Sequence, residues 1–270
     1  MVATMVGVWL LLDRVEVSRG SYALLVLAVV VLLPYVLGPL LIRFMHRQSA
    51  QPQLAPKRPE DLPRPATLFI VEATNALTTE GFAQWPIFAF GSETAMLFLK
   101  YFVNRATGDA AMAVVVQAGV GDIKRIADKH VTFSTKLVDE FEIRTTNTGT
   151  IGVMPPVPGR DVLQLLNVRD PLRLHQIHVA RVRRLSQGRS PVLPSEGQEI
   201  ATVTAEISQD LTRQVAVGYF YLDAKSQSYR PTWKGAVLMT WKSAWPVKQI
   251  RRQRLMRRAN EALRRIGSAS

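Results

Sequence analysis

The chain has 270 residues and no cysteine, which excludes a disulfide framework, a thiolate nucleophile and a thiolate metal site. Its formal net charge is +13, and +11 of that charge belongs to residues 225–270, where Glu261 is the only acidic side chain. A nearly neutral body with a basic carboxyl-terminal tail predicts that the tail meets an anionic surface, either lipid headgroups or nucleic acid.

Residues 22–42 form an uncharged run between Arg19 and Arg43, and positions 24–33 are apolar without a break. A helix of this length spans about 31 Å, which matches the hydrocarbon core of a bilayer. Pro34 and Pro39 predict a kink or an early end to this helix. Since the first twelve residues lack Lys and Arg and no small-residue cleavage site follows, the run does not fit a signal peptide. The sequence therefore predicts one transmembrane helix within an anchor region, 1–47.

Basic residues that flank the run predict its orientation. Arg14 and Arg19 precede it, and a larger group follows it closely: Arg43, Arg47, Lys57 and Arg58. Because loops next to a transmembrane helix carry more basic residues on the cytoplasmic side, we expect the carboxyl-terminal domain to face the cytoplasm. The predicted location is the plasma or inner membrane, with a single pass.

The segment after the predicted span is rich in proline. Residues 48–65 contain prolines at positions 52, 56, 59, 63 and 65, which disfavours both a helix and a central strand. We predict a linker here. A short helix is expected over 66–79, because Pro65 suits the first helical turn and Gly81 suits the helix end.

Five segments have the composition and alternation of strands. They are 85–90, 95–104, 110–117, 130–137 and 140–146. A glycine-containing turn at 106–109 joins the second to the third as a hairpin. Phe133 and Ile143 fall on the same face of the last two strands. This pattern predicts an antiparallel sheet of about five strands with one face covered by helices.

Two helices can supply that cover. Asp170 and Pro171 form a strong start signal, and Leu174 and Ile177 continue at helical spacing. Farther on, apolar residues recur at intervals of three or four over 200–215, before a possible hairpin at 219–233. We therefore predict an α+β domain at 66–190, followed at 191–270 by a helical segment with a hairpin and the basic tail.

The tail carries the strongest functional signal, because aromatic, apolar and basic residues are mixed there. An apolar stripe at Leu255, Ala259, Ala262 and Ile266 lies opposite a row of arginines on one basic amphipathic helix. Tryptophan and basic side chains both favour the headgroup region of a bilayer. We predict that the tail contacts anionic lipid headgroups through Trp233, Trp241, Trp245, Lys242, Lys248, Arg251, Arg252, Arg254, Arg257 and Arg258.

Two other interpretations of the tail stay open. The stripe can pack on the body and leave a solvated basic helix. Alternatively, the mixture of basic and aromatic residues can serve a nucleic acid, although no recognition-helix unit precedes it.

The chain shows no pattern typical of catalysis. His175 and His178 are three residues apart on the predicted helix, but no third metal ligand follows and nearby arginines would repel a cation. The acidic group Asp139, Glu140 and Glu142 fits a solubilising sheet edge better than acid–base catalysis. We predict no catalytic residue, cofactor or metal, and we favour a non-enzymatic protein over an enzyme.

The sequence leads to one functional hypothesis and two alternatives. The first is a single-pass protein whose cytoplasmic domain is a non-enzymatic interaction or scaffolding module for an unidentified protein partner. The alternatives are a membrane-anchored enzyme with unrecognised catalytic residues and a membrane-tethered nucleic-acid-binding protein.

Overall fold

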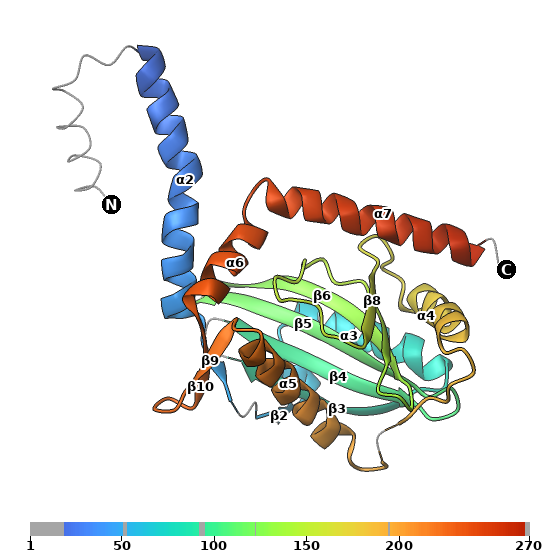
Figure 1. The fold of residues 1–270 in the computed structure, drawn as a ribbon. Helices are drawn as coiled ribbons and strands as arrows, with labels where there is room; N and C mark the ends of the chain where they lie inside the picture. Colours follow the sequence, from blue (N-terminus) through green and yellow to red (C-terminus); the bar gives the residue numbers. More distant parts are fainter. Residues whose placement is uncertain (1–18, 51–52, 92–94, 122, 194, 268–270) are drawn as a thin grey trace.

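The computed structural model describes residues 19–50, 53–91, 95–121, 123–193 and 195–267. These residues form six α-helices, a seven-stranded sheet and a three-stranded sheet, which is an α+β architecture (Figure 1). In chain order the elements are α2 (Arg19–Met45), β1 (Gln48–Ser49), β2 (Ala55–Lys57), the 3₁₀ helix η1 (Pro59–Asp61), α3 (Arg64–Thr79), β3 (Ala83–Gly91), β4 (Ala95–Asn104), β5 (Asp109–Val120), β6 (Ile123–Lys136), β7 (Glu142–Thr146), β8 (Arg160–Gln164), α4 (Pro171–Leu185), α5 (Glu199–Ala216), β9 (Phe220–Asp223), β10 (Ser228–Pro231), α6 (Trp233–Ser243) and α7 (Val247–Gly267).

The large sheet has the strand order β2-β3-β4-β5-β6-β7-β8. Neighbouring strands are antiparallel except β7 and β8, which are parallel. The prediction of about five antiparallel strands is therefore wrong. Strand β2 is a three-residue segment that contains Pro56, and β8 has only five residues, so neither shows enough alternation to be read as a strand.

One face of this sheet carries the main core. Phe102, Phe133 and Leu163 pack there against α3, α4 and α7, with Leu174 and Ile177 supplied by α4. The predicted contact between the Phe133 face and the helix that begins after Asp170 is confirmed. The Asp170 side chain accepts a hydrogen bond from the Leu172 backbone N–H, which caps α4 as expected.

Among the helices that contribute to the core clusters, only α5 covers the opposite face of the sheet. Because side chains alternate along a strand, Tyr101, Val103 and Ala110 point to this face, where they pack against Val203 and Ile207 of α5. The amino-terminal end of α5 is fixed by Glu199, which is fully buried and forms an ion pair with Arg105. This half-covered face contains the candidate site.

Helix α2 stands out from the body, and its carboxyl-terminal half packs against α6 (Figure 1). The two helices approach closely at Gly38, where an added Cβ would lie 2.6 Å from Thr240 Cγ2. Arg43 Nη1 donates to the Pro231 carbonyl oxygen over 2.6 Å, and this bond ties the helix to the three-stranded sheet β1-β10-β9.

The predicted transmembrane helix at 22–42 is wrong. In the part of the chain that the structure describes, no helix combines the length and the apolar character needed to cross a bilayer. Helix α2 includes Pro34 and Pro39 but continues to Met45, and its apolar residues Pro39 and Ile42 are used for packing within the protein.

The inferences that depended on that helix are wrong with it. They are the single-pass location in the plasma or inner membrane, the orientation with a cytoplasmic domain, and the three membrane-anchored functions.

Candidate functional site: a pocket between the sheet and α5

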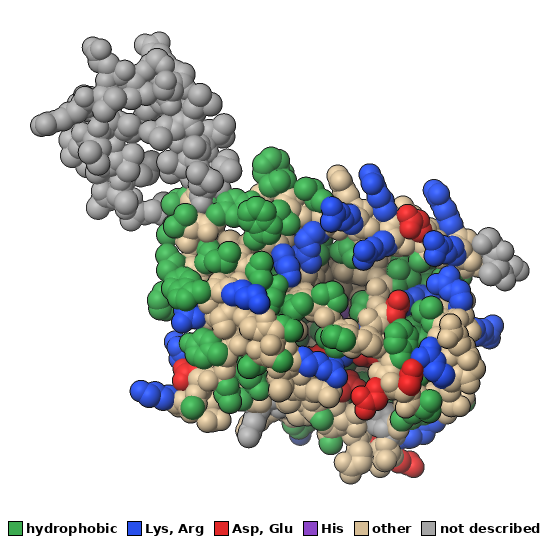
Figure 2. Space-filling view, viewed as in Figure 1, with side chains coloured by type: hydrophobic (Ala, Val, Ile, Leu, Met, Phe, Trp, Pro, Cys, Tyr) green, Lys and Arg blue, Asp and Glu red, His purple; other side chains and the backbone are tan. Residues whose placement is uncertain are grey.

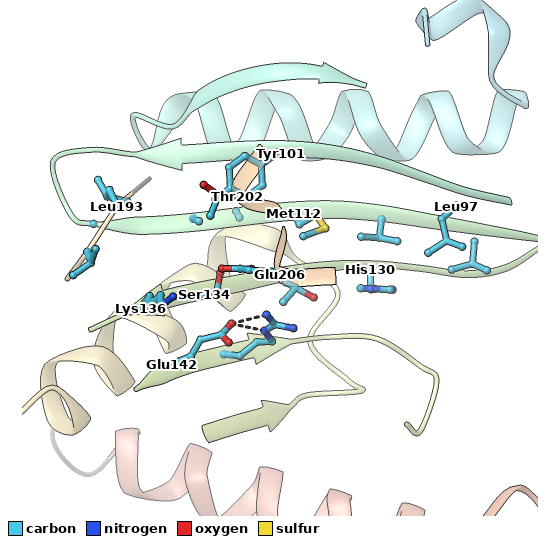
Figure 3. A pocket seen from close by; sticks show the side chains of 18 residues that line it. Leu97, Tyr101, Met112, His130, Ser134, Lys136, Glu142, Leu193, Thr202 and Glu206 are labelled. Atoms are coloured by element: carbon cyan, nitrogen blue, oxygen red, sulfur yellow. Dashed lines mark hydrogen bonds and ion pairs between the residues drawn. The ribbon is translucent and has the colours of Figure 1, made fainter. Parts of the chain in front are cut away.

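The structure has a pocket of about 350 Å³ between α5 and the half-covered face of the large sheet (Figure 3). This volume lies in the range of small-molecule sites, about 300–1,000 Å³. We call it the sheet–α5 pocket. It is lined by Leu97, Tyr101, Gly108, Ala110, Ala111, Met112, Val114, Val116, His130, Thr132, Ser134, Lys136, Glu142, Arg144, Val192, Leu193, Thr202 and Glu206.

The pocket is elongated along the strands and differs in chemistry between its ends. Leu97 and His130 lie at one end, and Lys136, Glu142 and Leu193 lie at the other (Figure 3). Apolar residues from β4 and β5 line the first end beside His130, whereas the charged side chains Lys136 and Glu142 lie towards the second end beside Leu193 (Figure 3). Such a gradient suits a ligand that is itself apolar at one end and polar at the other.

A network of ion pairs builds the polar end. Glu142 Oε1 accepts hydrogen bonds from Arg144 Nε at 2.8 Å and Nη2 at 2.5 Å. Its other oxygen, Oε2, accepts from Arg160 Nε at 2.5 Å, and Arg160 Nη1 reaches Asp210 Oδ2 of α5 at 2.9 Å. These charges satisfy one another and hold β7, β8 and α5 together, and two of them, Glu142 and Arg144, line the pocket.

Glu206 stands apart from that network. This half-buried carboxyl from α5 makes no hydrogen bond or ion pair with any residue that the structure describes. Burial, with a further contribution from the Glu142 charge, raises the pKa of Glu206 above its ordinary value. A carboxyl group with unused hydrogen-bonding capacity therefore faces the pocket.

Tyr101 lines the same pocket from strand β4. Burial, together with the Glu206 charge, raises the pKa of Tyr101 well above its ordinary value, so the phenol stays protonated. Its hydroxyl has no hydrogen-bond partner among the described residues, and its ring packs edge-on to Trp85 at 6.3 Å. Tyr101 can thus donate a hydrogen bond to a bound molecule.

His130 is held at the apolar end by a carboxylate. Its Nδ1 lies 3.1 Å from Asp128 Oδ2, which also accepts a 2.5 Å hydrogen bond from the Thr148 hydroxyl. Burial alone would raise the pKa of Asp128, but these bonds hold the pKa well below its usual range. No hydroxyl group within the described ranges is hydrogen-bonded to His130, and the adjacent Thr132 hydroxyl instead contacts Thr146 at 2.8 Å. The arrangement therefore lacks an activated nucleophile.

The two histidines considered for metal binding lie on the other face of the sheet. His178 is fully buried, with Nε2 2.9 Å from Thr135 Oγ1 and Nδ1 2.9 Å from Thr145 Oγ1. His175 Nε2 is 3.6 Å from Asp109 Oδ2, and both imidazoles stack on Phe133. Among the described residues no group of three His, Asp or Glu could hold a metal ion. These side chains form a polar network inside the core.

The environment of Glu142 also differs from the predicted one. We expected a solubilising carboxylate at a sheet edge, but β8 pairs with β7, so β7 is an internal strand. The Glu142 side chain is only 13 % exposed. The edge prediction is wrong for this residue.

The predicted lipid-contact residues fall into two groups. Most are exposed, on α6, on α7 or between them: Trp233, Trp241, Trp245, Lys248, Arg252, Arg254, Arg257 and Arg258. Two turn inward instead. Lys242 Nζ donates to the Val153 carbonyl at 2.9 Å and to Tyr219 Oη at 2.7 Å, and Arg251 Nη2 donates to the Gly152 carbonyl at 2.5 Å.

The apolar stripe of α7 packs on the body. Ala259 is buried, and Ala262, Leu263 and Ile266 contact the same core cluster as Phe133. This arrangement corresponds to the alternative in which the stripe serves the fold. Apart from Arg251, the arginines of the helix are exposed and face away from the core (Figure 2).

Sequence reasoning missed the sheet–α5 pocket. A signal was present, because His130, Thr132, Ser134 and Lys136 alternate with the core residues of the same strand and therefore share one face. Four polar residues on a covered face indicate either a network or a pocket. Glu206 could not be assigned to it, since its approach to the sheet depends on how α5 crosses the strands.

Comparisons with known proteins give no further guidance: no family model matches the sequence, and neither curated proteins nor solved structures yield a match. Functional inference therefore depends on the geometry of the chain itself.

Proposed function

We propose that this protein binds a small amphipathic molecule, an apolar chain that carries a protonated amine, in the sheet–α5 pocket. The observation that supports this proposal most directly is Glu206, a half-buried carboxyl at the pocket wall without a partner among the described residues. An ammonium group would supply the missing partner, because a charge-assisted hydrogen bond favours the ionised carboxylate.

The other charges near Glu206 do not compete for this role. Arg144 and Arg160 are already paired with Glu142, and Arg160 is also paired with Asp210. Lys136 is exposed to water, which screens its charge. The Tyr101 hydroxyl adds a second hydrogen-bonding group at the polar end.

The apolar end would receive the chain of the ligand. Leu97, Met112, Val114 and Val116 line it, and they belong to clusters that α5 covers only in part. Burial of an alkyl chain there contributes about 0.8 kcal/mol per methylene group, which favours an extended apolar ligand over a compact polar one.

Calorimetric titration with n-octylamine tests the proposal, with n-octanoate as the probe of equal chain length and opposite charge. We expect octylamine to bind and octanoate to bind at least about tenfold more weakly, since the charged hydrogen bond contributes about 1.5–3 kcal/mol. The affinity for octylamine should fall as the pH drops through the raised pKa of Glu206, because protonation removes the negative charge.

Two variants make the titration specific. Glu206→Gln should weaken octylamine binding about tenfold or more. The matched control, Glu261→Gln, removes the same charge from an exposed position on α7 and should leave binding unchanged. Equal affinities for octylamine and octanoate, or equal effects of the two substitutions, would refute the proposal.

A further inference from the structure

A second surface of the molecule is apolar and lies far outside the sheet–α5 pocket. Hydrophobic side chains gather over α2 and α6, next to the lysines and arginines along α7 (Figure 2). Met45 is 72 % exposed and Trp245 is 69 % exposed. We define the aromatic surface by its exposed members Leu41, Phe44, Met45, Trp233, Val237, Trp241, Trp245 and Ile250. A gathering of exposed apolar side chains on a protein surface typically marks an interaction site.

Helix α2 contacts the rings of Trp233 and Trp241 and the backbone of Trp245. Trp241 packs edge-on against Tyr35 with ring centroids 5.8 Å apart, and the Tyr35 hydroxyl donates to the Trp245 carbonyl oxygen. The Arg43 guanidinium lies 5.0 Å from the centroid of the Trp233 ring. Ordered but exposed aromatic rings have lost much of their conformational entropy before any partner binds.

Helix α7 places a basic face beside the aromatic surface. We define this basic face by Lys248, Arg252, Arg254, Arg257 and Arg258, all of which are exposed. None of these five side chains forms an ion pair with a described residue, and Glu261 is the only acidic residue on the helix. Because the apolar stripe of α7 is used for packing, the basic face points outward.

We infer that the aromatic surface and the basic face together dock on the headgroup region of an acidic lipid bilayer. Charge complementarity selects the partner, since five unpaired cations favour a densely anionic surface. Indole rings beside these cations favour the boundary between headgroups and acyl chains. A nucleic acid would use the cations but would leave Leu41, Phe44 and Met45 exposed to water. This docking requires no spanning segment.

Vesicle co-sedimentation of the full chain tests the inference, with phosphatidylcholine vesicles that contain or lack phosphatidylserine. The wild-type protein should bind the acidic vesicles far more strongly. Arg252, Arg254, Arg257 and Arg258 changed together to Gln should weaken that binding about 100-fold, because each basic residue near the surface contributes a severalfold gain. The same four positions changed to Lys provide the control, which keeps the charge and should retain most of the binding.

Vesicle binding at high salt tests the contribution of the aromatic surface separately. Raising the salt to 1 M shortens the Debye length to about 3 Å, so the binding that remains should depend on the apolar contacts. Trp241→Ala with Trp245→Ala should reduce this remainder more than it reduces binding at low salt. Octylamine titration of the same variants should be normal, which separates this inference from the proposed function.

Three results would overturn the inference: equal binding to neutral and acidic vesicles, equal loss in the Gln and Lys variants, or binding to duplex or single-stranded nucleic acid without binding to acidic vesicles. The last result would assign the basic face to a nucleic acid.

Discussion

Glu206 shows how a single side chain connects stability with binding. A carboxyl that is half-buried without a partner is an unfavourable element of a fold, because burial disfavours its charged form. Binding sites commonly retain such groups, since a substitution that stabilises the protein would remove the function. The neighbouring Glu142 has the opposite situation, with both oxygens bonded.

Replacing Glu206 should therefore stabilise the unliganded protein. The folded-state pKa of Glu206 lies above its unfolded value, so the folded protein binds more protons, and stability decreases as the pH rises from about 4.5 through the folded pKa. We expect Glu206→Gln to raise the midpoint of thermal unfolding at pH 7, with a gain that vanishes below about pH 4.5. A lower midpoint at pH 7 would show that the carboxylate has an internal partner.

His178 should make the fold sensitive to acid. Burial lowers the pKa of His178, and although Asp109 opposes this shift, Arg181 and His175 add to it. The unfolded chain takes up the proton near pH 6.5 while the folded chain resists it, so stability should fall as the pH drops below about 6.5.

Urea unfolding of the wild type and His178→Gln across pH 5–7 measures this effect. The free energy of unfolding should depend less steeply on pH in the variant. Some dependence should persist, because burial also lowers the pKa of His46. Identical slopes would contradict a neutral, buried His178.

At the scale of the element, α7 has two faces with different roles. Ala259 and Ile266 belong to the face that packs on the core, and the arginines belong to the face that points outward. The same 3.6-residue periodicity that predicts an amphipathic helix cannot tell whether its apolar stripe meets lipid or protein. In this protein it meets protein.

Adjacent residues on α7 allow a matched test of that packing. Ala259→Arg should lower the free energy of unfolding by several kcal/mol, since it inserts a charge into the core. Asn260→Arg adds the same charge one residue later on the exposed side and should change stability by less than about 0.5 kcal/mol. Urea unfolding would contradict the packing if the two variants were equally stable.

For the whole molecule, local sequence patterns predicted the helices and strands better than they predicted which elements pair or pack with one another. Alternation at Phe133 and Ile143 and the Asp170 cap identified strands β6 and β7 and helix α4. The short strands β2 and β8 were not predicted, because they are defined by pairing with neighbours distant in sequence. The run at 22–42 was misassigned because an apolar helix whose carboxyl-terminal half packs on α6 resembles one that packs on lipid.

The pocket illustrates the same limit. Its strand residues could be grouped by their period of two, but the position of α5 above them depends on tertiary contacts such as the Glu199–Arg105 ion pair. A site that lies between the sheet and a helix can therefore be recognised only when the positions of both are known.

The central claim is that the sheet–α5 pocket binds an amphipathic amine, and methyl NMR of methionine-labelled protein tests it most directly. Met112 is the one methionine among the lining residues, so the other seven methionines of the chain serve as internal references. We predict a saturable shift of the Met112 methyl signal with octylamine, and about tenfold more octylamine for the same shift in Glu206→Gln. A Met112 signal that stays fixed while other methionines shift would contradict the account.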